Sequence, residues 1–167
     1  MIRTAFGMAM VALVLATTAP AGAQPGTSAM AFETMKEAVG TWRPADRPDS
    51  PLRIRFYLTA GGTVLVEEWT RNGQPHSLTL YHRDGADLIA THYCPQGNQP
   101  RLAVQPQADP GVIRFAFRDV TDLDPANESH AVALVFDLSN EQVLVRQETY
   151  RRNDTDEHSE LRLVRES

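Results

Sequence analysis

The chain has 167 residues, of which 42% are hydrophobic and 22% are charged, and its formal net charge is -5. An acidic chain is repelled by nucleic acid and by anionic membrane surfaces, so neither is an expected partner. The single cysteine, Cys94, excludes a disulfide within the chain. The stability of the fold must therefore come from a packed core.

The first 23 residues have the organisation of a secretory signal peptide. Arg3 supplies a positive start, an apolar stretch covers residues 5–16, and Ala21-Gly22-Ala23 has the small residues of a cleavage site. The apolar stretch is too short to span a bilayer. The sequence therefore predicts a cleaved signal peptide over residues 1–23, a periplasmic or secreted location, and one domain over residues 24–167.

One short helix precedes a series of segments that have the period of strands. Apolar residues in "MAFETMKEAVG" recur at helical spacing, and Gly40 ends the pattern. From residue 52 onward the period is two, and turn signals such as Asn72-Gly73 separate the predicted strands. Tight turns make neighbouring strands antiparallel, and closure removes the exposed edges of a large sheet. We expect an all-β fold, a closed antiparallel up-and-down β-barrel of about 8–10 strands with a short N-terminal helix.

Alternate residues of each strand would line the interior of such a barrel. If the apolar residues mark the inner face, the expected partner is a small hydrophobic or amphipathic ligand, with no cofactor. We expect a monomer or a homodimer. The residues predicted to line the interior are Ile54, Phe56, Leu58, Val64, Val66, Leu78, Leu80, Phe115, Phe117, Val132, Leu134 and Phe136.

Two stretches of the chain resemble a known family. "VGTWR" (residues 39–43), a Gly-x-Trp after a short helix, resembles the opening signature of lipocalin-like (calycin) barrels. The sequence that runs through "THYCPQGNQPRL" is similar to small secreted bacterial calycin-like domains of uncharacterised function. The resemblance implies the barrel fold, an extracytoplasmic setting, and a place for Gly40 and Trp42 at the closed end of the barrel. It implies no activity and no catalytic residues.

The run "THYCPQGNQPR" (residues 91–101) holds the densest set of chemically capable side chains. His92 and Cys94 are two apart on a predicted strand, so they share a face. A two-residue turn at Asp84-Gly85 would set His92 opposite Ser77, whereas a three-residue loop would set it opposite His76. The second register separates apolar from polar residues more cleanly. We therefore predict that His76, His92 and Cys94 face the interior near one mouth of the barrel.

This cluster has three interpretations. His-x-Cys with His76 has ligand types that suit zinc or copper, but no carboxylate is placed to orient the imidazoles. A Cys-His nucleophile pair needs hydrogen-bond contact, and neighbours on one face of a strand are roughly 7 Å apart. The third interpretation, which we favour, is a buried polar cluster, with no metal and no catalytic residue assigned. As a separate alternative, a haem-binding barrel would need one of the five histidines as an axial ligand in an open pocket.

Asn98, Arg101 and one of two adjacent glutamates complete the candidate site. Asn98 and Arg101 either hold their own loop together or fix the polar end of a ligand. Glu67 and Glu68 point to opposite sides of a strand, so only one can face inward. "RQETYRR" (146–152) is predicted as a solvated strand face. The candidate ligand-binding residues are His76, His92, Cys94, Asn98, Arg101 and Glu68, and the alternative function is an enzyme that uses His76, His92, Glu68 and Arg101.

Overall fold

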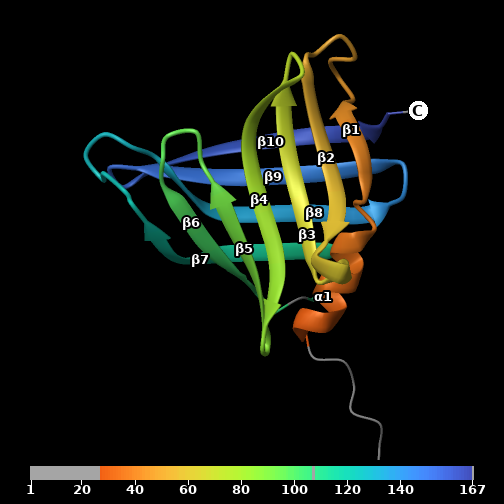
Figure 1. Cartoon of the computed structure of the whole chain (residues 1–167), viewed down its shortest axis with the longest axis horizontal. Helices are drawn as coiled ribbons and strands as arrows, with labels where there is room; N and C mark the ends of the chain where they lie inside the picture. Colours follow the sequence, from red (N-terminus) through yellow and green to blue (C-terminus); the bar gives the residue numbers. More distant parts are fainter. Residues whose placement is uncertain (1–26, 107, 167) are drawn as a thin grey trace, which may run out of the picture.

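The structure, a computed structural model, describes residues 27–106 and 108–166, which form one helix, one short 3-10 turn and ten strands (Figure 1). The predicted signal peptide lies outside the described residues. Within those ranges no helix has the length and hydropathy of a membrane span. The elements are α1 (Thr27–Lys36), β1 (Gly40–Pro44), β2 (Leu52–Thr59), η1 (Ala60–Gly62), β3 (Val64–Arg71), β4 (Gln74–Asp84), β5 (Asp87–Tyr93), β6 (Gln99–Val104), β7 (Val112–Thr121), β8 (His130–Asn140), β9 (Val143–Arg152) and β10 (Thr155–Arg165).

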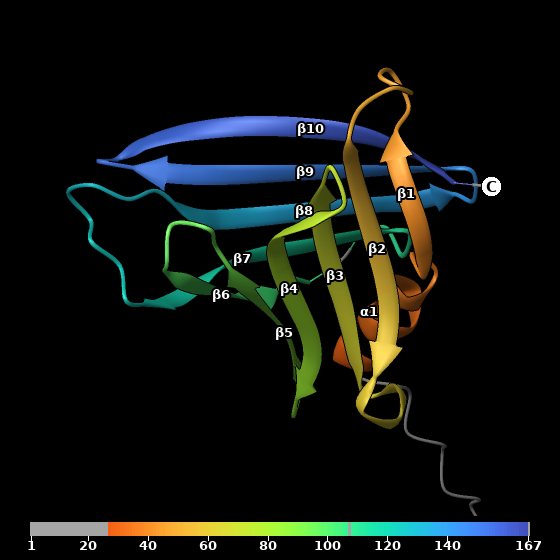
Figure 2. The same cartoon turned by 45° about the horizontal axis from the view of Figure 1, so that its top comes forward.

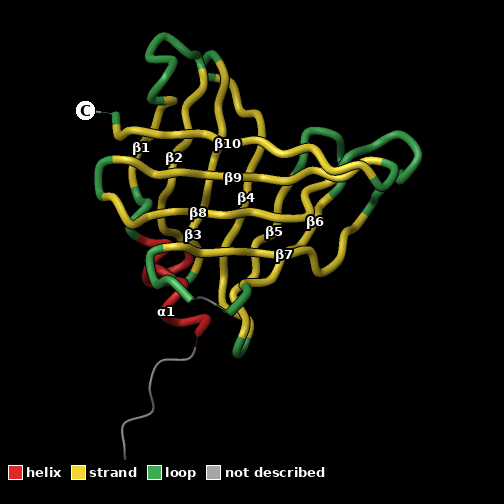
Figure 3. Tube along the Cα trace, turned by 180° about the vertical axis from the view of Figure 1, so that it is seen from behind, coloured by secondary structure: helices red, strands yellow, loops and turns green. Residues whose placement is uncertain are grey.

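The ten strands form a closed antiparallel barrel. Each strand pairs with its neighbours in the chain, and β1 pairs with β10 to close the ring. Figures 2 and 3 show β1 to β4 crossing over β7 to β10, so the two halves of the wall face each other across one core. The predicted fold class, strand count included, is confirmed.

Helix α1 covers one end of the barrel, which we call the closed end. Phe32 and Met35 of the helix are buried, and the helix contacts β4, β5 and β7. The Ser28 hydroxyl donates a hydrogen bond of 3.3 Å to the carbonyl of Gly85 in the β4–β5 turn. The apolar face of α1 therefore joins the barrel core.

Trp42 and Arg165 complete the closed end. Trp42 is 1% exposed, and its Nε1 donates a hydrogen bond of 2.7 Å to the carbonyl of Ala38. The Arg165 guanidinium lies 4.3 Å from the centre of the Trp42 ring and donates to two carbonyls in the segment after α1. A Cβ atom at Gly40, whose φ is +141°, would lie 2.4 Å from Nη1 of Arg165. The Gly-x-Trp motif thus leaves room for the arginine that covers the tryptophan.

Large aromatic side chains fill the middle of the barrel. Phe136 lies edge-on to Phe56 at 6.3 Å, to Tyr81 at 5.9 Å and to Phe115 at 6.4 Å between ring centres. Tyr81 and Phe115 are 5.6 Å apart. All four side chains are at most 2% exposed. Because these rings meet across the core, the closed half of the barrel is packed.

The β4–β5 hairpin has neither of the two predicted registers. Asp84 pairs with Asp87, so the turn consists of Gly85 and Ala86, and His92 lies opposite Thr79. Gly85 has a φ of +60°, which suits the first central position of a two-residue hairpin turn. The favoured three-residue loop would set His92 opposite His76, three positions from its observed partner Thr79, and an odd shift of this kind exchanges the two faces of β4. The other predicted register, with a two-residue turn one residue too early, is shifted by two positions and keeps the observed faces.

This register corrects part of the predicted lining. On β3 and β4 the residues predicted to line the interior lie on the opposite face from Leu65, Glu67 and Tyr81, and Val66, although 3% exposed, pairs on that face with Leu80. On β2, β7 and β8 the predictions Ile54, Phe56, Phe115, Leu134 and Phe136 are buried in the core. The residues wrongly predicted to face inward are Val64, Val66, Leu78 and Leu80, and the residues found there are Leu65, Glu67, Trp69, Thr79 and Tyr81.

Candidate functional site

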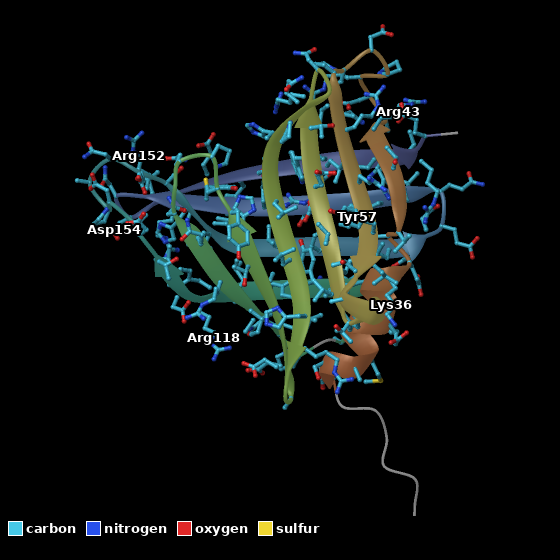
Figure 4. The ribbon with its side chains drawn as sticks, in the orientation of Figure 1. Lys36, Arg43, Tyr57, Arg118, Arg152 and Asp154 are labelled. Atoms are coloured by element: carbon cyan, nitrogen blue, oxygen red, sulfur yellow. The ribbon has the colours of Figure 1, made fainter. Side chains whose placement is uncertain are left out.

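The end of the barrel opposite Trp42 carries a hollow of about 390 Å³, here called the mouth hollow. It lies where β9 turns into β10, and Figure 4 marks Arg152 and Asp154 there, far from Lys36 of α1. Asn153 and Asp154 both have positive φ, as a tight two-residue hairpin turn requires. The residues that line the mouth hollow are Ser129, Tyr150, Arg152, Asn153, Thr155 and Glu157.

Inward-facing polar side chains form a row that we call the polar track, which runs from the mouth hollow past Tyr150 and Glu148 to Arg146 and Glu67. On β9, Arg146, Glu148 and Tyr150 are two apart, so their side chains share the inner face. On β10, Ser159 lies opposite Glu148, and Glu157 lies opposite Tyr150. The segment predicted as a solvated strand face therefore carries the main polar residues of the interior.

Glu67, Arg146 and Glu148 form a buried group that we call the ion cluster. The Nε of Arg146 lies 2.7 Å from Oε1 of Glu67, and its Nη1 lies 2.5 Å from Oε2 of Glu148. The side chains of Glu67 and Arg146 are 0% and 2% exposed, whereas that of Glu148 is 20% exposed. Glu148 is therefore the member of the cluster that reaches towards the mouth.

Aromatic groups surround the inner part of the ion cluster. Trp69 Nε1 donates to Oε1 of Glu67 at 2.6 Å, and the Tyr81 hydroxyl donates to its Oε2 at 2.5 Å. The Arg146 guanidinium lies 4.8 Å from the centre of the Trp69 ring and 5.6 Å from that of Phe136. Both oxygens of Glu67 thus have donors, as a buried carboxylate requires.

His92 lies between two hydroxyl groups. Its Nδ1 is 2.9 Å from Oγ1 of Thr79, and its Nε2 is 3.1 Å from the hydroxyl of Tyr150. Burial lowers the pKa of His92 to about 4, and the positive charge of Arg146 adds to the effect. The imidazole is therefore neutral at pH 7, with one nitrogen that donates and one that accepts.

The neighbouring groups keep fixed charge states at pH 7. Burial raises the pKa of the Tyr150 hydroxyl, and the carboxylate of Glu148 raises it further, so Tyr150 stays protonated. Burial also works to raise the pKa of Glu148, but the attraction of Arg146 outweighs it, and the pKa lies below its ordinary value. The ion cluster thus holds two carboxylates and one guanidinium, beside a neutral imidazole.

His76 and Glu68 are not part of this site. Both border a hollow of about 330 Å³ on the outer wall, together with Leu78 and Tyr93. The prediction that His76 faces inward across from His92 is wrong, because the hairpin register sets Thr79 there. Glu67, and not Glu68, is the inward glutamate of the adjacent pair.

The side chains of Asn98 and Arg101 form hydrogen bonds and an ion pair with other residues of the protein. The Asn98 amide nitrogen donates to Oε2 of Glu128 at 3.0 Å and to the carbonyl of Ser129 at 3.1 Å. Arg101 forms a two-pronged, exposed ion pair with Asp119 on the adjacent strand, at 2.5 and 2.8 Å. These contacts join the 94–101 loop to its neighbours, which is the structural alternative given for it above.

Cys94 borders the site. Its thiol is half-buried, and burial raises its pKa. Cys94 follows directly on β5, and its backbone N–H donates to the carbonyl of Asn98, whose side chain contacts Ser129 at the mouth hollow. Of the six candidate ligand-binding residues, the structure brings His92, Cys94 and Asn98 to the open half of the barrel.

Sequence reasoning missed Arg146, Glu148 and Tyr150. The available signal was their alternation in "LVRQETY", which continues the inner-face position of Leu144. Among the described residues, no group of three or more His, Cys, Asp or Glu side chains could hold a metal ion. No protein-family model matches the chain, and no curated protein matches it. The lipocalin-like resemblance therefore stays a prediction.

Proposed function

We propose that the protein binds a small amphipathic molecule at the open end of the barrel, in the mouth hollow and against Tyr150. The observation that carries the proposal is the polar track from Glu67 through Glu148 and Tyr150 to the hollow. Burial of charged groups costs free energy, and a barrel that needs only stability can fill such positions with apolar side chains. The stability of the fold alone therefore does not explain why these positions carry charged and polar side chains.

The dimensions and lining of the mouth hollow support binding. Its volume of about 390 Å³ lies within the range of roughly 300–1,000 Å³ that is usual for small-molecule sites. Tyr150 offers an apolar ring and a hydroxyl, and its contact with His92 fixes the position of that hydroxyl. Because the closed half is packed, the ligand would occupy the mouth and not a deep apolar cavity.

The two hydrogen-bonding groups beneath the hollow suit recognition. His92 is neutral and Tyr150 is protonated at pH 7, so each can donate or accept without a change of charge. The enzyme alternative rested on His76, His92, Glu68 and Arg101, and these four residues lie on different faces of the wall. Binding is therefore the function that the arrangement supports best.

A small-fragment screen observed by protein NMR tests the proposal. We expect fragments that combine a ring with a polar group to shift the amide signals of Ser129, Tyr150 and Thr155. Thr155→Trp should fill the hollow and abolish these shifts. His158→Trp, on the opposite face of the same strand, should preserve them. Fragment shifts that survive Thr155→Trp, or a broad screen in which no fragment shifts these amides, would overturn the proposal.

A further inference from the structure

The charge of the polar track restricts the ligand class. The ion cluster contains two carboxylates, Glu67 and Glu148, and one guanidinium, Arg146. His92, which lies beside the cluster, has hydroxyl partners on both nitrogens. The interior below the mouth hollow therefore carries one negative charge more than it carries positive charges.

The excess charge belongs to the carboxylate nearest the mouth. Glu67 receives hydrogen bonds from Trp69, Tyr81 and Arg146 and is fully buried. Glu148 is 20% exposed, and among the described residues its Oε1 accepts only a hydroxyl hydrogen bond of 3.2 Å, from Ser159. The free capacity of the cluster to accept a hydrogen bond from a ligand is thus concentrated at Oε1 of Glu148.

The mouth hollow adds a second carboxylate and an aromatic ring. Glu157 lies opposite Tyr150 on the inner face of β10, and within the described ranges it makes no hydrogen bond or ion pair with another side chain. Arg152, at the rim of the hollow, donates instead to the carbonyl of Asn127 at 2.7 Å. Glu157 and the Tyr150 ring thus line the hollow itself, with the positive charge of Arg152 at its rim, and Glu148 lies one inner-face position deeper on β9.

We propose that the ligand of this site is a small organic cation, an ammonium group carried on an apolar or aromatic body. The inference rests on the proposed binding function and deepens it. The ammonium would donate to Glu148 and Glu157, and its body would lie against the Tyr150 ring, since carboxylates and the face of an aromatic ring both attract a cation. A ligand carboxylate would meet net negative charge in a partly buried site.

Three probes of similar shape test the ligand class at pH 7: 2-phenylethylammonium, the neutral 2-phenylethanol and the anionic phenylacetate. We expect the ammonium to bind at least about tenfold more tightly than the alcohol, and phenylacetate to bind most weakly, as measured by calorimetry or by amide shifts. Equal binding of the ammonium and the alcohol, or preference for phenylacetate, would overturn the inference. The proposed binding function would survive that result, because it fails only if no ligand occupies the hollow.

Variants that each remove one carboxylate test whether the preference for the ammonium over the alcohol comes from this site. Glu148→Gln and Glu157→Gln should each reduce the preference for the ammonium over the alcohol several-fold. Glu160→Gln removes the same charge from the outer face of β10, where Glu160 accepts from Gln147, and should leave the preference unchanged. If Glu148→Gln fails to fold, the exposed Glu157→Gln still decides the result. If all three variants reduce the preference equally, the preference reflects the overall charge of the protein. That result would contradict cation binding at Glu148 and Glu157.

Discussion

The Nε of Arg146 lies 2.7 Å from Oε1 of Glu67, and the two side chains are 2% and 0% exposed. The residues are 79 positions apart, on β9 and β3, which are not neighbours in the barrel wall. Their contact therefore crosses the interior and joins the two facing halves. Burial of both charges is offset only while both partners are present.

Removal of one partner of this pair should be costly. We expect Arg146→Met to lower the free energy of unfolding by about 3–5 kcal/mol, because it leaves Glu67 charged and buried. The double variant Glu67→Gln/Arg146→Met should lose less than the sum of the two single variants, by about 1 kcal/mol or more. Urea unfolding followed by tryptophan fluorescence measures all three.

Arg151→Met is the matched control on the same strand. Arg151 pairs with Asp156 on the outer face at 2.7 and 2.9 Å. Since water screens an exposed pair, this variant should change stability far less than Arg146→Met. Additive effects of the Glu67 and Arg146 variants would contradict a coupled pair.

His92 should make stability depend on pH between about 4 and 6.5. Its folded-state pKa is lowered to about 4, so the unfolded chain binds a proton in this range that the folded protein does not. Relative to His92→Gln, wild type should therefore lose stability as the pH falls from 6.5, by up to about 3 kcal/mol near pH 4. Above pH 6.5 the difference should be constant.

The measurement is urea unfolding of both proteins at several pH values. An NMR titration of the His92 ring gives an independent readout, in which the imidazole signals should move only near pH 4. A midpoint close to 6.5 in the folded protein would show that His92 is solvated, and the packing between Thr79 and Tyr150 would then be wrong.

The barrel could be predicted from the sequence because its signals are local. Period-two segments and tight turns such as Asn72-Gly73 each fall within about ten residues, and antiparallel closure follows from them. The inward orientation of His92 on β5 was also predicted correctly, and it shares its face with Leu88 and Ala90, which are fully buried. Short-range patterns of this kind are sufficient to predict the architecture of the barrel.

The site could not be predicted in the same way, because its partners are far apart in the chain. On β3 and β4 the rule that apolar residues face inward exchanged the two faces, since Glu67 and Thr79 lie on the inner face and Val66 lies on the other face, opposite Leu80. A carboxylate is stable inside only with a partner, and that partner, Arg146, is on β9. No local feature of either strand identifies the other.

Asn98 should stabilise the loop that follows β5. Asn98→Ala removes the donors to Glu128 and to the Ser129 carbonyl, and we expect a loss of about 1–2 kcal/mol in urea unfolding. Asn98→Asp should cost more, because it sets a second carboxylate against Glu128. If the aspartate variant is as stable as the alanine variant, the Asn98–Glu128 contact is absent in solution.

Arg165 should stabilise the closed end through its planar group. Arg165→Ala loses the stacking on Trp42 and two hydrogen bonds to carbonyls, and should lower stability by about 1–2 kcal/mol. Arg165→Lys should recover only part of the loss, because an ammonium cannot stack and donate as a flat fork. Arg162→Ala, at an exposed position of the same strand, is the control, and full recovery by lysine would refute the role of the planar group.

Cys94 should react slowly with a thiol reagent in the folded protein. The thiolate is the reactive form, and burial raises the pKa of this thiol while it also limits access to the sulfur. We expect alkylation by iodoacetamide at pH 8, followed by mass spectrometry, to be several-fold slower than in urea-denatured protein. A rate equal to that of the denatured chain would show that Cys94 is fully exposed and would contradict its predicted inward orientation.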